Sequence, residues 1–542
     1  MPVSEDCTPQ IRALLLSKSQ NYMATLEQRE ELHRTIWAMA DELRGAVGGW
    51  EFKAYVLGTL FYRFISENLT DYINRLQAEA GVEDFDYAQM ADEDAEMARE
   101  QMVQEKGFFI LPSQLFKNVC ETCEQDENLN MTLSNIFREI EGSAIGTDSE
   151  DDMKGLFSDF NVDSTQLGGD VQTRNKLIAK VLLKVRDMNL GDEFQENKID
   201  AFGDAYEFLM TMYAANGGKS GGEFFTPQEV SELLARFTAA DGHEIRSVYD
   251  PACGSGSLLL KFSKTVGKNN PSLKYYGQEI NPTTYNLCRI NMFLHDINYD
   301  NFDIQLGDTL INPLHRDFEP FDAIVSNPPY STQWEGSKNP LLINDDRYAG
   351  PGVLAPDKTA DLAFTLHMLA SLSERGTAAI VEFPGVLYRG GKEQTIRRWL
   401  VENNYVDTII QLPSNLFFGV GIATCIIILR KSARPDNKIL FIDASKEFVK
   451  NGNKNRLTTE NQEHIYQVFA ERKEEEYFSR LVSVDEVLAN EANLSVSSYV
   501  EQEDTREVID IALVNANINT LIAEGNALNA RIDDIIKELG GE

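Results

Sequence analysis

The sequence predicts an α/β protein with an all-helical N-terminal domain, a doubly wound domain and a C-terminal heptad helix. Three observations predict this class. Apolar residues recur at spacings of three and four through residues 27–216, and short apolar runs then alternate with helical segments through residues 217–480. The C-terminal region, residues 481–542, contains a seven-residue apolar repeat. Residues 1–26 are expected to form a loose N-terminal extension.

Composition and charge limit the classes of function. Hydrophobic residues make up 42% of the chain and charged residues 25%, which is typical of a globular protein. Lys and Arg number 50 and Asp and Glu number 86, so the net charge is −36. This charge argues against a chain that binds nucleic acid unaided or lies on an anionic membrane, because both need clustered cations. No transmembrane helix or signal peptide is expected, so we predict a cytoplasmic protein without membrane contact.

The six cysteines are scattered and do not form a disulfide framework. Cys120 and Cys123 have the spacing of a zinc knuckle. No second pair of cysteines or histidines follows at a suitable distance. We therefore interpret this CxxC as incidental and expect no metal site.

The helical domain is predicted from apolar residues that return every three or four positions, as they do on one face of a helix. They are Leu32, Ile36, Met39, Leu43, Val56, Leu60 and Phe64. The carboxylate-rich stretch from Glu79 to Glu100 is expected to be a solvated loop or an exposed helix.

The second domain is predicted from alternating strands and helices. The expected strands are 247–250, 274–280, 303–306, 323–325, 377–381, 407–411 and 423–429. The expected helices are 257–265, 282–295, 360–373 and 391–403. This order indicates a Rossmann-like, mostly parallel sheet, in which ligands bind beyond the carboxyl ends of the strands.

The tail carries an a/d heptad. Its two rows are Ile511, Ile518, Gly525, Ile532 and Leu539, and Val514, Leu521, Leu528 and Ile535. Ile522 and Ile536 widen this stripe. The pattern favours a helix that packs in a coiled coil with another chain, while a long amphipathic helix on its own domain stays an alternative.

The first strand of the second domain leads into a candidate cofactor loop. Asp250 ends the strand, where its carboxylate can meet a cationic or hydroxylated ligand group. Gly254 and Gly256 allow the backbone to turn tightly and to approach a ligand closely. Glu279 ends the next strand and can accept hydrogen bonds from two ribose hydroxyls.

Two ligands fit this loop, a dinucleotide or S-adenosylmethionine. A dinucleotide site requires a third glycine where this chain has Leu259. A sulfonium cofactor has no phosphate and carries an ammonium group, which suits Asp250. Asp308 follows the next strand and could accept from an adenine amino group, although a plain turn aspartate explains it as well.

The sequence Asn327-Pro328-Pro329-Tyr330 follows the strand at 323–325. The prolines fix the backbone and leave carbonyls free to accept hydrogen bonds. The Asn327 oxygen and the Pro328 carbonyl can hold the two hydrogens of an amino group, and Tyr330 can stack on a ring. The motif predicts methyl transfer to a planar amine without a covalent nucleophile, with a rigid loop after a strand as the structural alternative.

With these motifs the chain resembles the modification subunit of a type I restriction–modification system. This subunit is an S-adenosylmethionine-dependent N6-adenine DNA methyltransferase of the gamma motif order. The segments that carry the resemblance are 31–37, 61–67, 222–227, 250–257, 278–281, 327–330 and 383–390. The resemblance covers roughly residues 27 to 540.

The resemblance implies further cofactor contacts. The segment that packs on the methionine part of the cofactor is Glu223, Phe224, Phe225, Thr226, Pro227 and Gln228, although a helix start would also explain it. Ser255, Gly256, Ser257 and Glu279 match the remaining contacts. Cys253 departs from the pattern, since many relatives carry Ala there.

The resemblance also implies an activity and partners. The family methylates the N6 amino group of adenine in a specific double-stranded DNA sequence, after the base has left the duplex. Two modification subunits bind one DNA specificity subunit, which reads the sequence, and restriction subunits join this core. The N-terminal domain is implied to close around DNA and to sense existing methylation, and the heptad tail to pack on the specificity subunit. With its acidic total, the chain alone is expected to bind DNA weakly and in a salt-sensitive manner.

Three alternatives remain at this point. An amide methyltransferase acting on protein or RNA could use the same motif, and a DNA-complex scaffold could use the cofactor only as a sensor. The third is a dinucleotide oxidoreductase, which the missing third glycine disfavours.

Overall fold

The computed structural model of the chain divides into two compact units, Met1–Val500 and Glu501–Glu542. The described residues are 31–36, 38, 49–190, 202, 205, 208–209, 226–267, 270, 272–417, 421–432, 436–452, 454–503 and 510–540. The predicted extension 1–26 and three predicted cofactor contacts, Glu223, Phe224 and Phe225, lie outside these described residues.

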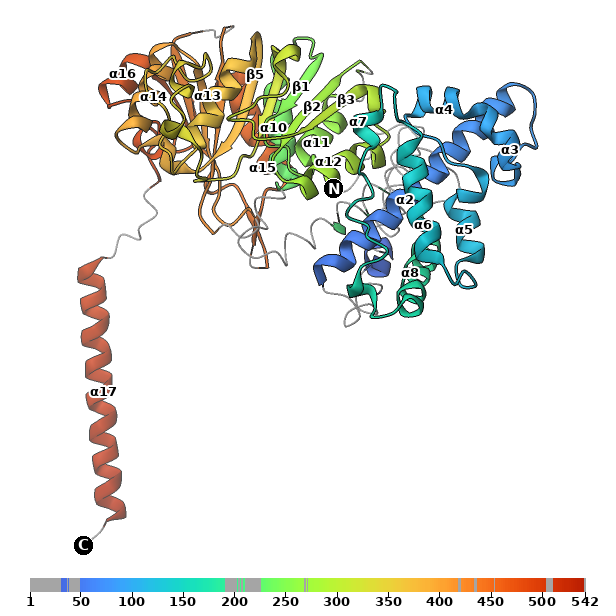
Figure 1. The fold of residues 1–542 in the computed structure, drawn as a ribbon. Coiled ribbons are helices and arrows are strands. Elements are labelled where there is room, and N and C mark those ends of the chain that lie inside the picture. The colour runs from blue at the N-terminus through green and yellow to red at the C-terminus, as the bar shows by residue number, and fades with distance from the viewer. Residues whose placement is uncertain are drawn as a thin grey trace, which may run out of the picture. The chain divides into compact units, whose positions relative to one another are not determined.

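The N-terminal part of the first unit is helical (blue to teal in Figure 1). Its helices are α2 (Gly49–Glu79), α3 (Asp92–Ala95), α4 (Arg99–Lys106), α5 (Phe116–Thr122), α6 (Leu129–Gly142), α7 (Glu150–Met153) and α8 (Val171–Arg186). Tyr62 of α2 packs edge-on against Phe116 of α5 and Phe137 of α6. No described residue between 49 and 190 lies in a strand, as the spacing predicted.

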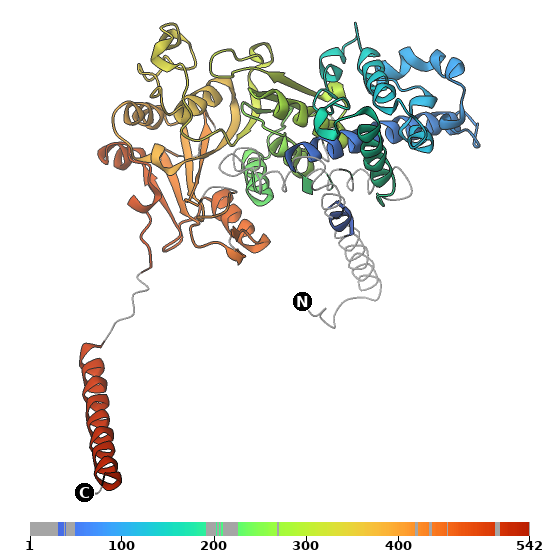
Figure 2. The ribbon, with the colours of Figure 1, turned by 60° about the horizontal axis from the view of Figure 1, so that its bottom comes forward.

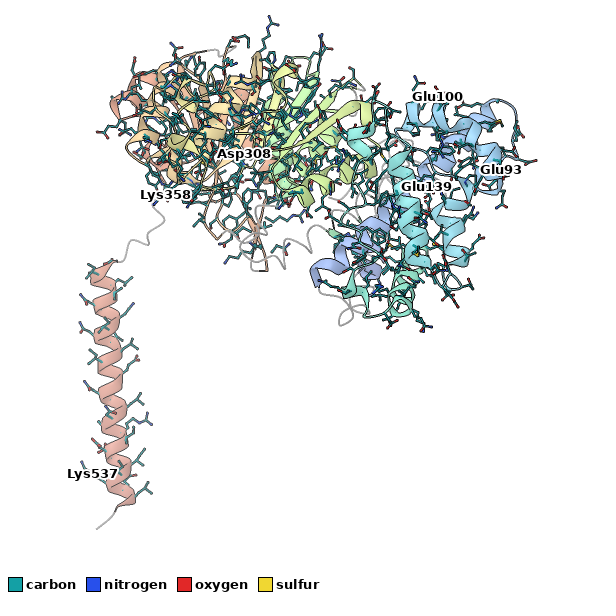
Figure 3. All side chains as sticks on the ribbon, in the orientation of Figure 1. Glu93, Glu100, Glu139, Asp308, Lys358 and Lys537 are labelled. Carbon is teal, nitrogen blue, oxygen red and sulfur yellow. The ribbon has the colours of Figure 1, made fainter. Side chains whose placement is uncertain are left out.

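Much of the acidic surplus lies on the outside of this helical part. Glu93, Glu100 and Glu139 are exposed there, and Figure 3 labels them. Exposed carboxylates remain hydrated, so they add net charge at little cost in folding free energy.

In the described residues, nine strands form one sheet in the order β11-β8-β6-β7-β5-β4-β1-β2-β3. They are β1 (Ser247–Asp250), β2 (Lys274–Glu279), β3 (Phe302–Leu306), β4 (Phe321–Ser326), β5 (Leu372–Glu382), β6 (Val406–Gln411), β7 (Cys425–Arg430), β8 (Lys438–Asp443) and β11 (Ser479–Ser483). The accompanying helices are α10 (Gln228–Thr238), α11 (Ser257–Thr265), α12 (Pro282–Leu294), α13 (Asp361–Ser371), α14 (Lys392–Glu402), α15 (Thr459–Glu471) and α16 (Val484–Ala489). β9 (Val449–Asn451) and β10 (Lys454–Arg456) form a separate antiparallel pair.

Strand directions bring many strand ends to one side of the sheet. β1 pairs in parallel with β2 and β4, and β2 with β3, β4 with β5 and β6 with β8 also pair in parallel. β7 is antiparallel to both β5 and β6, so β5 and β6 run the same way. The strands β1–β6 and β8 therefore end at one side, which we call the carboxyl edge.

The mostly parallel sheet is as predicted, but its C-terminal half differs in detail. β5 begins at Leu372, inside the predicted helix 360–373, because Leu372 already pairs with Phe321 of β4. Strands β8 to β11 and helices α15 and α16 were not predicted. The first unit extends to Val500, later than the predicted boundary at residue 481, because β11 pairs with β8.

The helical part packs beside α12 and the β3 side of the sheet, as Figures 1 and 2 both show. Arg289 of α12 is 1% exposed and donates to the carbonyl oxygens of Asp151 (2.8 Å) and Lys154 (3.0 Å). Asn286 donates to the Ser158 hydroxyl at 2.8 Å. A buried guanidinium requires such acceptors, so these bonds help fix the helical part against the sheet.

The second unit contains α17 (Ile511–Leu539), which confirms a helix over the predicted heptad. Asp510 caps it by accepting from the backbone N–H groups of Ala512 and Leu513. No residue of α17 is buried, and its apolar stripe includes Leu521 at 66% and Leu528 at 58% exposure. No described helix is both long and apolar enough to cross a membrane.

Candidate active site

A cavity of about 260 Å³ opens at the carboxyl edge, where β1, β2, β3 and β4 end side by side. The segments after all four strands line it, together with the Phe364 side of α13. Five predicted site residues are among the lining residues: Gly254, Glu279, Asp308, Asn327 and Pro329. The topology thus brings the predicted cofactor residues and the predicted catalytic loop to one place.

The loop after β1 depends on two glycines in left-handed backbone conformations. Gly254 has φ 55° and Gly256 has φ 81°. A Cβ atom on Gly256 would lie 2.8 Å from the Cys288 sulfur, so this position is closed to larger residues. A Cβ on Gly254 would meet no atom within 4 Å, so its surroundings leave room for a ligand to approach the backbone.

Asp250 lies beneath this loop and is 1% exposed. Its Oδ1 accepts from the Ala252 N–H (3.0 Å) and from the Ser326 hydroxyl (2.8 Å), which ties β1 to β4. Its Oδ2 has no hydrogen-bond partner among the described residues. Burial raises the pKa of Asp250 to about 7, against these two hydrogen bonds. A cationic ligand group above Pro251 and Ala252, which line the cavity, would favour the ionised form.

Glu279 lines the cavity from the end of β2 with a fixed orientation. One carboxylate oxygen accepts from the Gly254 N–H at 2.9 Å and the other from the Asn281 N–H at 2.8 Å. Burial raises the pKa of Glu279, and these bonds oppose that effect. Each oxygen keeps a free lone pair, so the side chain can also accept from a pair of hydroxyl groups.

Asp308, in the loop after β3, both stabilises a turn and lines the cavity. Its Oδ1 accepts from the Leu310 N–H at 3.0 Å, as a turn aspartate does, and its side of the loop lines the cavity. Arg347 holds the same loop: it is 4% exposed and donates to the carbonyls of Thr309 (2.8 Å) and Leu310 (3.0 Å). Asp345 pairs with this guanidinium at 2.8 Å. No motif pointed to Arg347, because its role depends on a loop 38 residues away.

The Asn327 loop follows β4. The Asn327 amide donates to the Thr226 hydroxyl at 3.0 Å, and its Oδ1 accepts from the Tyr330 hydroxyl at 2.5 Å. These two bonds fix the amide so that its oxygen, which has a second lone pair, can still accept from a ligand. Pro329 lines the cavity and Pro328 is buried.

The chain turns sharply after this motif. Ser331 has φ 53°, a strained conformation for a residue with a side chain, and its N–H donates to Asp361 Oδ1 at 3.0 Å. The turn directs the next residues back over the cavity. Trp334 and Phe364 line the cavity there, and neither was predicted from the sequence. An aromatic residue four positions after Tyr330 is the signal that could have identified Trp334.

Other predicted residues support the site from outside the cavity lining. Thr226 is 4% exposed and holds Asn327, while Pro227 caps α10 and Gln228 begins it. Ser255 is 2% exposed, and its carbonyl accepts from Asn291 at 2.9 Å. Ser257 is the first residue of α11.

The residues present fit the predicted cofactor and an amine substrate. The cavity is lined by a carboxylate oriented by two N–H groups and by an aspartate on the next loop, and the buried Asp250, with one unpaired oxygen, directly precedes the lining residues Pro251 and Ala252. This set suits a ribose, an adenine amino group and an ammonium in that order. Asn327 lines the same cavity, so the arrangement can direct an amino group toward a bound cofactor.

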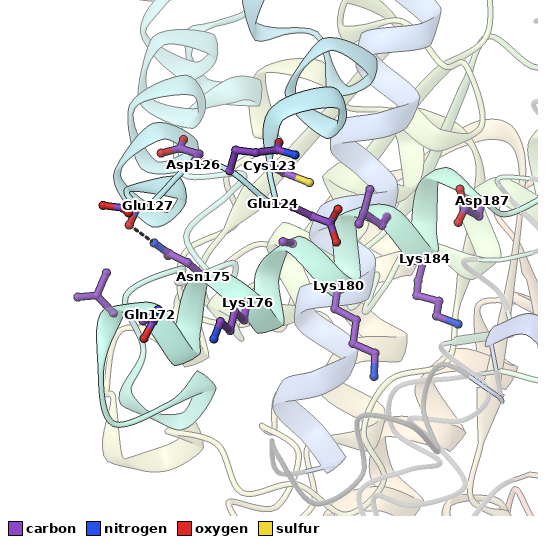
Figure 4. Close-up of a pocket in the computed structure, with 14 residues that line it drawn as sticks. Cys123, Glu124, Asp126, Glu127, Gln172, Asn175, Lys176, Lys180, Lys184 and Asp187 are labelled. Carbon is purple, nitrogen blue, oxygen red and sulfur yellow. Dashed lines mark hydrogen bonds between the residues drawn. The ribbon is translucent and has the colours of Figure 1, made fainter.

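A second cavity, of about 970 Å³, lies in the helical part, and Figure 4 shows its lining. No predicted site residue lines this cavity. Cys123, from the CxxC interpreted above as incidental, forms part of its wall. The lysines Lys176, Lys180 and Lys184 of α8 share its lining with four carboxylates, those of Glu124, Asp126, Glu127 and Asp187. Its lining therefore has a surplus of one carboxylate and no net positive charge. Cys120 and Cys123 are buried among the helices, and no group of residues suited to a metal occurs in the described part of the chain.

Comparisons with known proteins agree with both parts of the first unit. The N-6 DNA Methylase family matches residues 197–508, and the HsdM N-terminal domain family matches residues 32–185. These two matches divide the chain between its helical part and its sheet part, as the predicted fold class does.

Individual relatives match nearly the whole chain. The type I restriction enzyme MpnII methylase subunit of Mycoplasma pneumoniae is 48% identical over 95% of this chain and 97% of its own length. The crystal structure of a type I restriction–modification methyltransferase subunit from Streptococcus thermophilus is 32% identical, with a TM-score of 0.79 over 87% of this chain and 100% of that one. A structure from work on assembly of a type I R-M system has the same fold at 19% identity, with a TM-score of 0.61 over 95% of this chain and 99% of that one. The predicted fold class is thus confirmed.

Proposed function

The chain belongs to the methylase subunits of type I restriction–modification systems and is an adenine-specific DNA methyltransferase, and on this premise we propose how its site acts. In this proposal the cavity at the carboxyl edge binds S-adenosylmethionine and an adenine base that has left the duplex. The observation that carries it is that Asn327 lines the same cavity as Glu279 and Asp308.

S-adenosylmethionine supplies a methyl group on a positively charged sulfur. Glu279 binds the ribose hydroxyls, and Asp308 accepts from the adenine amino group of the cofactor. Asp250 provides a negative charge beneath the loop for the ammonium group. Thr226 to Gln228, together with Glu223 to Phe225, complete the methionine side.

The Asn327 oxygen and the Pro328 carbonyl accept the two hydrogens of the target amino group. This directs the nitrogen lone pair at the methyl group and disperses the positive charge that develops on nitrogen. The Thr226 and Tyr330 hydrogen bonds keep the amide from rotating. The reaction needs no covalent enzyme intermediate.

The amino group of a base stacked inside the duplex cannot enter an active-site cavity, so the adenine has to be extruded. Extrusion costs a few kcal/mol, which stacking on an aromatic ring can offset. In this proposal Tyr330, which contacts Asn327 from outside the cavity lining, supplies this ring, and Trp334 lines the cavity.

Sequence recognition belongs to a separate specificity subunit in this proposal, with two methylase subunits for each specificity subunit and restriction subunits added to this core. The apolar stripe of α17 provides the contact, because a heptad helix with no buried residue needs a partner helix. The complex acts on cytoplasmic DNA.

The proposal is tested by co-expressing the chain with the specificity subunit encoded beside it and mapping methylated adenines in the host DNA. We expect N6-methyladenine at one defined sequence. Purified complex with radiolabelled cofactor should label DNA and leave added protein unlabelled. Label in protein or RNA instead of DNA would contradict the proposal.

A further inference from the structure

The β9–β10 hairpin is a cationic segment in an acidic chain. Residues 444–458 contain four cations, Lys446, Lys450, Lys454 and Arg456, and one carboxylate, Glu447, in a chain of net charge −36. Lys446 and Lys450 are exposed, and neither forms an ion pair with another described residue.

Glu447, the single carboxylate of this segment, does not pair with the exposed lysines, because it contacts residues of α15 instead. Glu447 accepts from the Asn461 amide and lies 3.1 Å from His464 Nδ1. Its negative charge is thus engaged by α15, and the outer side of the hairpin keeps its positive charge.

The hairpin lies at the same carboxyl edge as the active site, because it follows the end of β8. Arg456 Nε pairs with Glu229 Oε1 at 2.6 Å. Glu229 is in the first turn of α10, three residues after Thr226, which holds Asn327. A short chain of contacts therefore joins the hairpin to the catalytic loop.

The other attachments hold both faces of the hairpin against the body of the unit, while Lys450 itself stays exposed. Lys454 Nζ donates to the Phe417 carbonyl at 2.5 Å, and the Asn455 amide donates to the Ser414 carbonyl at 2.8 Å. Lys454 and Arg456 share a face in the pairing register, and both contact the body of the unit. Lys450 pairs with Asn455 on the opposite face, and it remains exposed although Asn455 contacts Ser414.

We propose that the β9–β10 hairpin contacts the phosphate backbone of DNA beside the extruded adenine, through Lys446 and Lys450, with Arg456 and Lys454 holding it in position. This inference rests on the proposed function and extends it, because it locates a phosphate contact on a chain whose total charge opposes DNA. Exposed lysines, together with the exposed Asn451, supply donors suited to phosphate oxygens.

The composition favours DNA over a protein partner. The cores of protein interfaces are depleted in lysine and rich in aromatic residues. Among the described residues, the segment exposes Lys446, Lys450 and Asn451, and Val449 is its one large exposed apolar residue.

The test measures binding of the full chain to a short duplex at low ionic strength over a range of salt concentrations. We expect the Lys446→Ala/Lys450→Ala double variant to bind about tenfold more weakly. We also expect the slope of log affinity against log salt to be less steep by about two, since each lost phosphate contact removes about one unit. Lys450→Glu should weaken binding further. Cofactor affinity and thermal unfolding should be unchanged in all of these variants.

The matched control is Arg375→Ala/Lys438→Ala, which removes two exposed charges near the opposite edge of the sheet, where β5 and β8 begin. It should leave the salt slope unchanged. An equal effect of the control would show that net charge alone matters and would overturn the proposal.

Three other results would also overturn it: unchanged DNA affinity and slope in the double variant, no DNA binding by the unaltered chain at low ionic strength, and lost association with the specificity subunit while DNA binding is kept. The last result would assign the hairpin to a protein interface. The proposed function is measured separately by methyl transfer in the complex, so it can stand when the hairpin proposal fails.

Discussion

The two halves of the carboxyl edge differ in charge and in burial. Beyond β1, β2 and β3 the edge carries carboxylates: Asp250 is buried, and Glu279 is held by two backbone N–H groups. Beyond β8 the edge carries cations: Lys446 and Lys450 are exposed on a hairpin. One sheet thus presents an acidic, enclosed half and a basic, open half.

This difference shows how an acidic chain can act on a polyanion. Buried carboxylates act over a few ångströms on a small cationic cofactor, where the local dielectric constant is low. Exposed lysines act on a long polyanion, and salt screens them beyond about 10 Å. The net charge of −36 describes neither half.

The largest effect should come from the acidic half. We expect Asn327→Ala to reduce methyl transfer by about 10²–10³-fold or more, because the amine loses its main acceptor. Cofactor affinity measured by calorimetry should stay within about twofold, since the cofactor contacts lie on other loops. Asn344→Ala, an exposed asparagine of the following segment, is the control. Full methylation by Asn327→Ala in the reconstituted complex would end its catalytic assignment.

A smaller effect should come from Asp250. Its pKa is raised to about 7 by burial, and an ammonium ligand favours the ionised form. Cofactor affinity should therefore rise as pH increases through about 7 and fall up to tenfold per unit below it.

Asp250→Asn should weaken cofactor binding by about 10- to 100-fold and remove this pH dependence. Titration calorimetry over a pH series measures both. Asp322→Asn, at the start of β4, controls for loss of a carboxylate. A pH dependence that persists in Asp250→Asn would assign it to another group.

Tyr330 should have a moderate effect. Tyr330→Phe keeps the ring but removes the hydroxyl that donates to Asn327. We expect a three- to tenfold lower kcat, the value of one hydrogen bond, with little change in KM for DNA. Tyr330→Ala should also raise KM, because the stacking ring is lost. If Tyr330→Phe changes kcat and KM as much as Tyr330→Ala does, the hydroxyl and not the stacking ring would account for the role of Tyr330.

The smallest effect, on the unfolding free energy, should come from His464, which contacts Glu447 of the basic half. His464 lies between Glu447 and Glu475, whose hydrogen bonds raise its pKa against the effect of burial. A histidine whose pKa is raised in the folded protein stabilises the fold while it is protonated. This contribution is complete at pH values below the pKa of the unfolded state, and it is lost as the pH rises through the pKa of the folded state. The unfolding free energy should therefore fall as pH rises above about 6.5, by less than about 1 kcal/mol because the group is partly exposed.

His464→Gln should flatten this dependence in chemical unfolding followed across the same pH range. His243, which is partly buried and lies beside Asp241, provides a control variant. An unchanged pH dependence in His464→Gln would place its origin elsewhere.

Sequence patterns were informative where structure is local. β1 and α11 have the predicted bounds, because a buried strand, a glycine turn and a helix start are all encoded within a few residues. Asn327 and Glu279 could be identified because each directly follows or ends such a strand. The strands β8 to β11 were not predicted. They are short, and pairing with β6 and with each other is what makes them strands.

The sequence by itself determined the family, the helical and sheet parts, and the residue types of the acidic half, because motif spacing and periodicity are properties of neighbouring residues. Tertiary structure alone decided what joins these pieces. Arg347 holds a loop 38 residues away, and Arg456 pairs with Glu229 across 227 residues. It also decided that the hairpin and the Asn327 loop follow strands that end at the same edge, because strand order in a sheet depends on long-range pairing that local patterns do not encode.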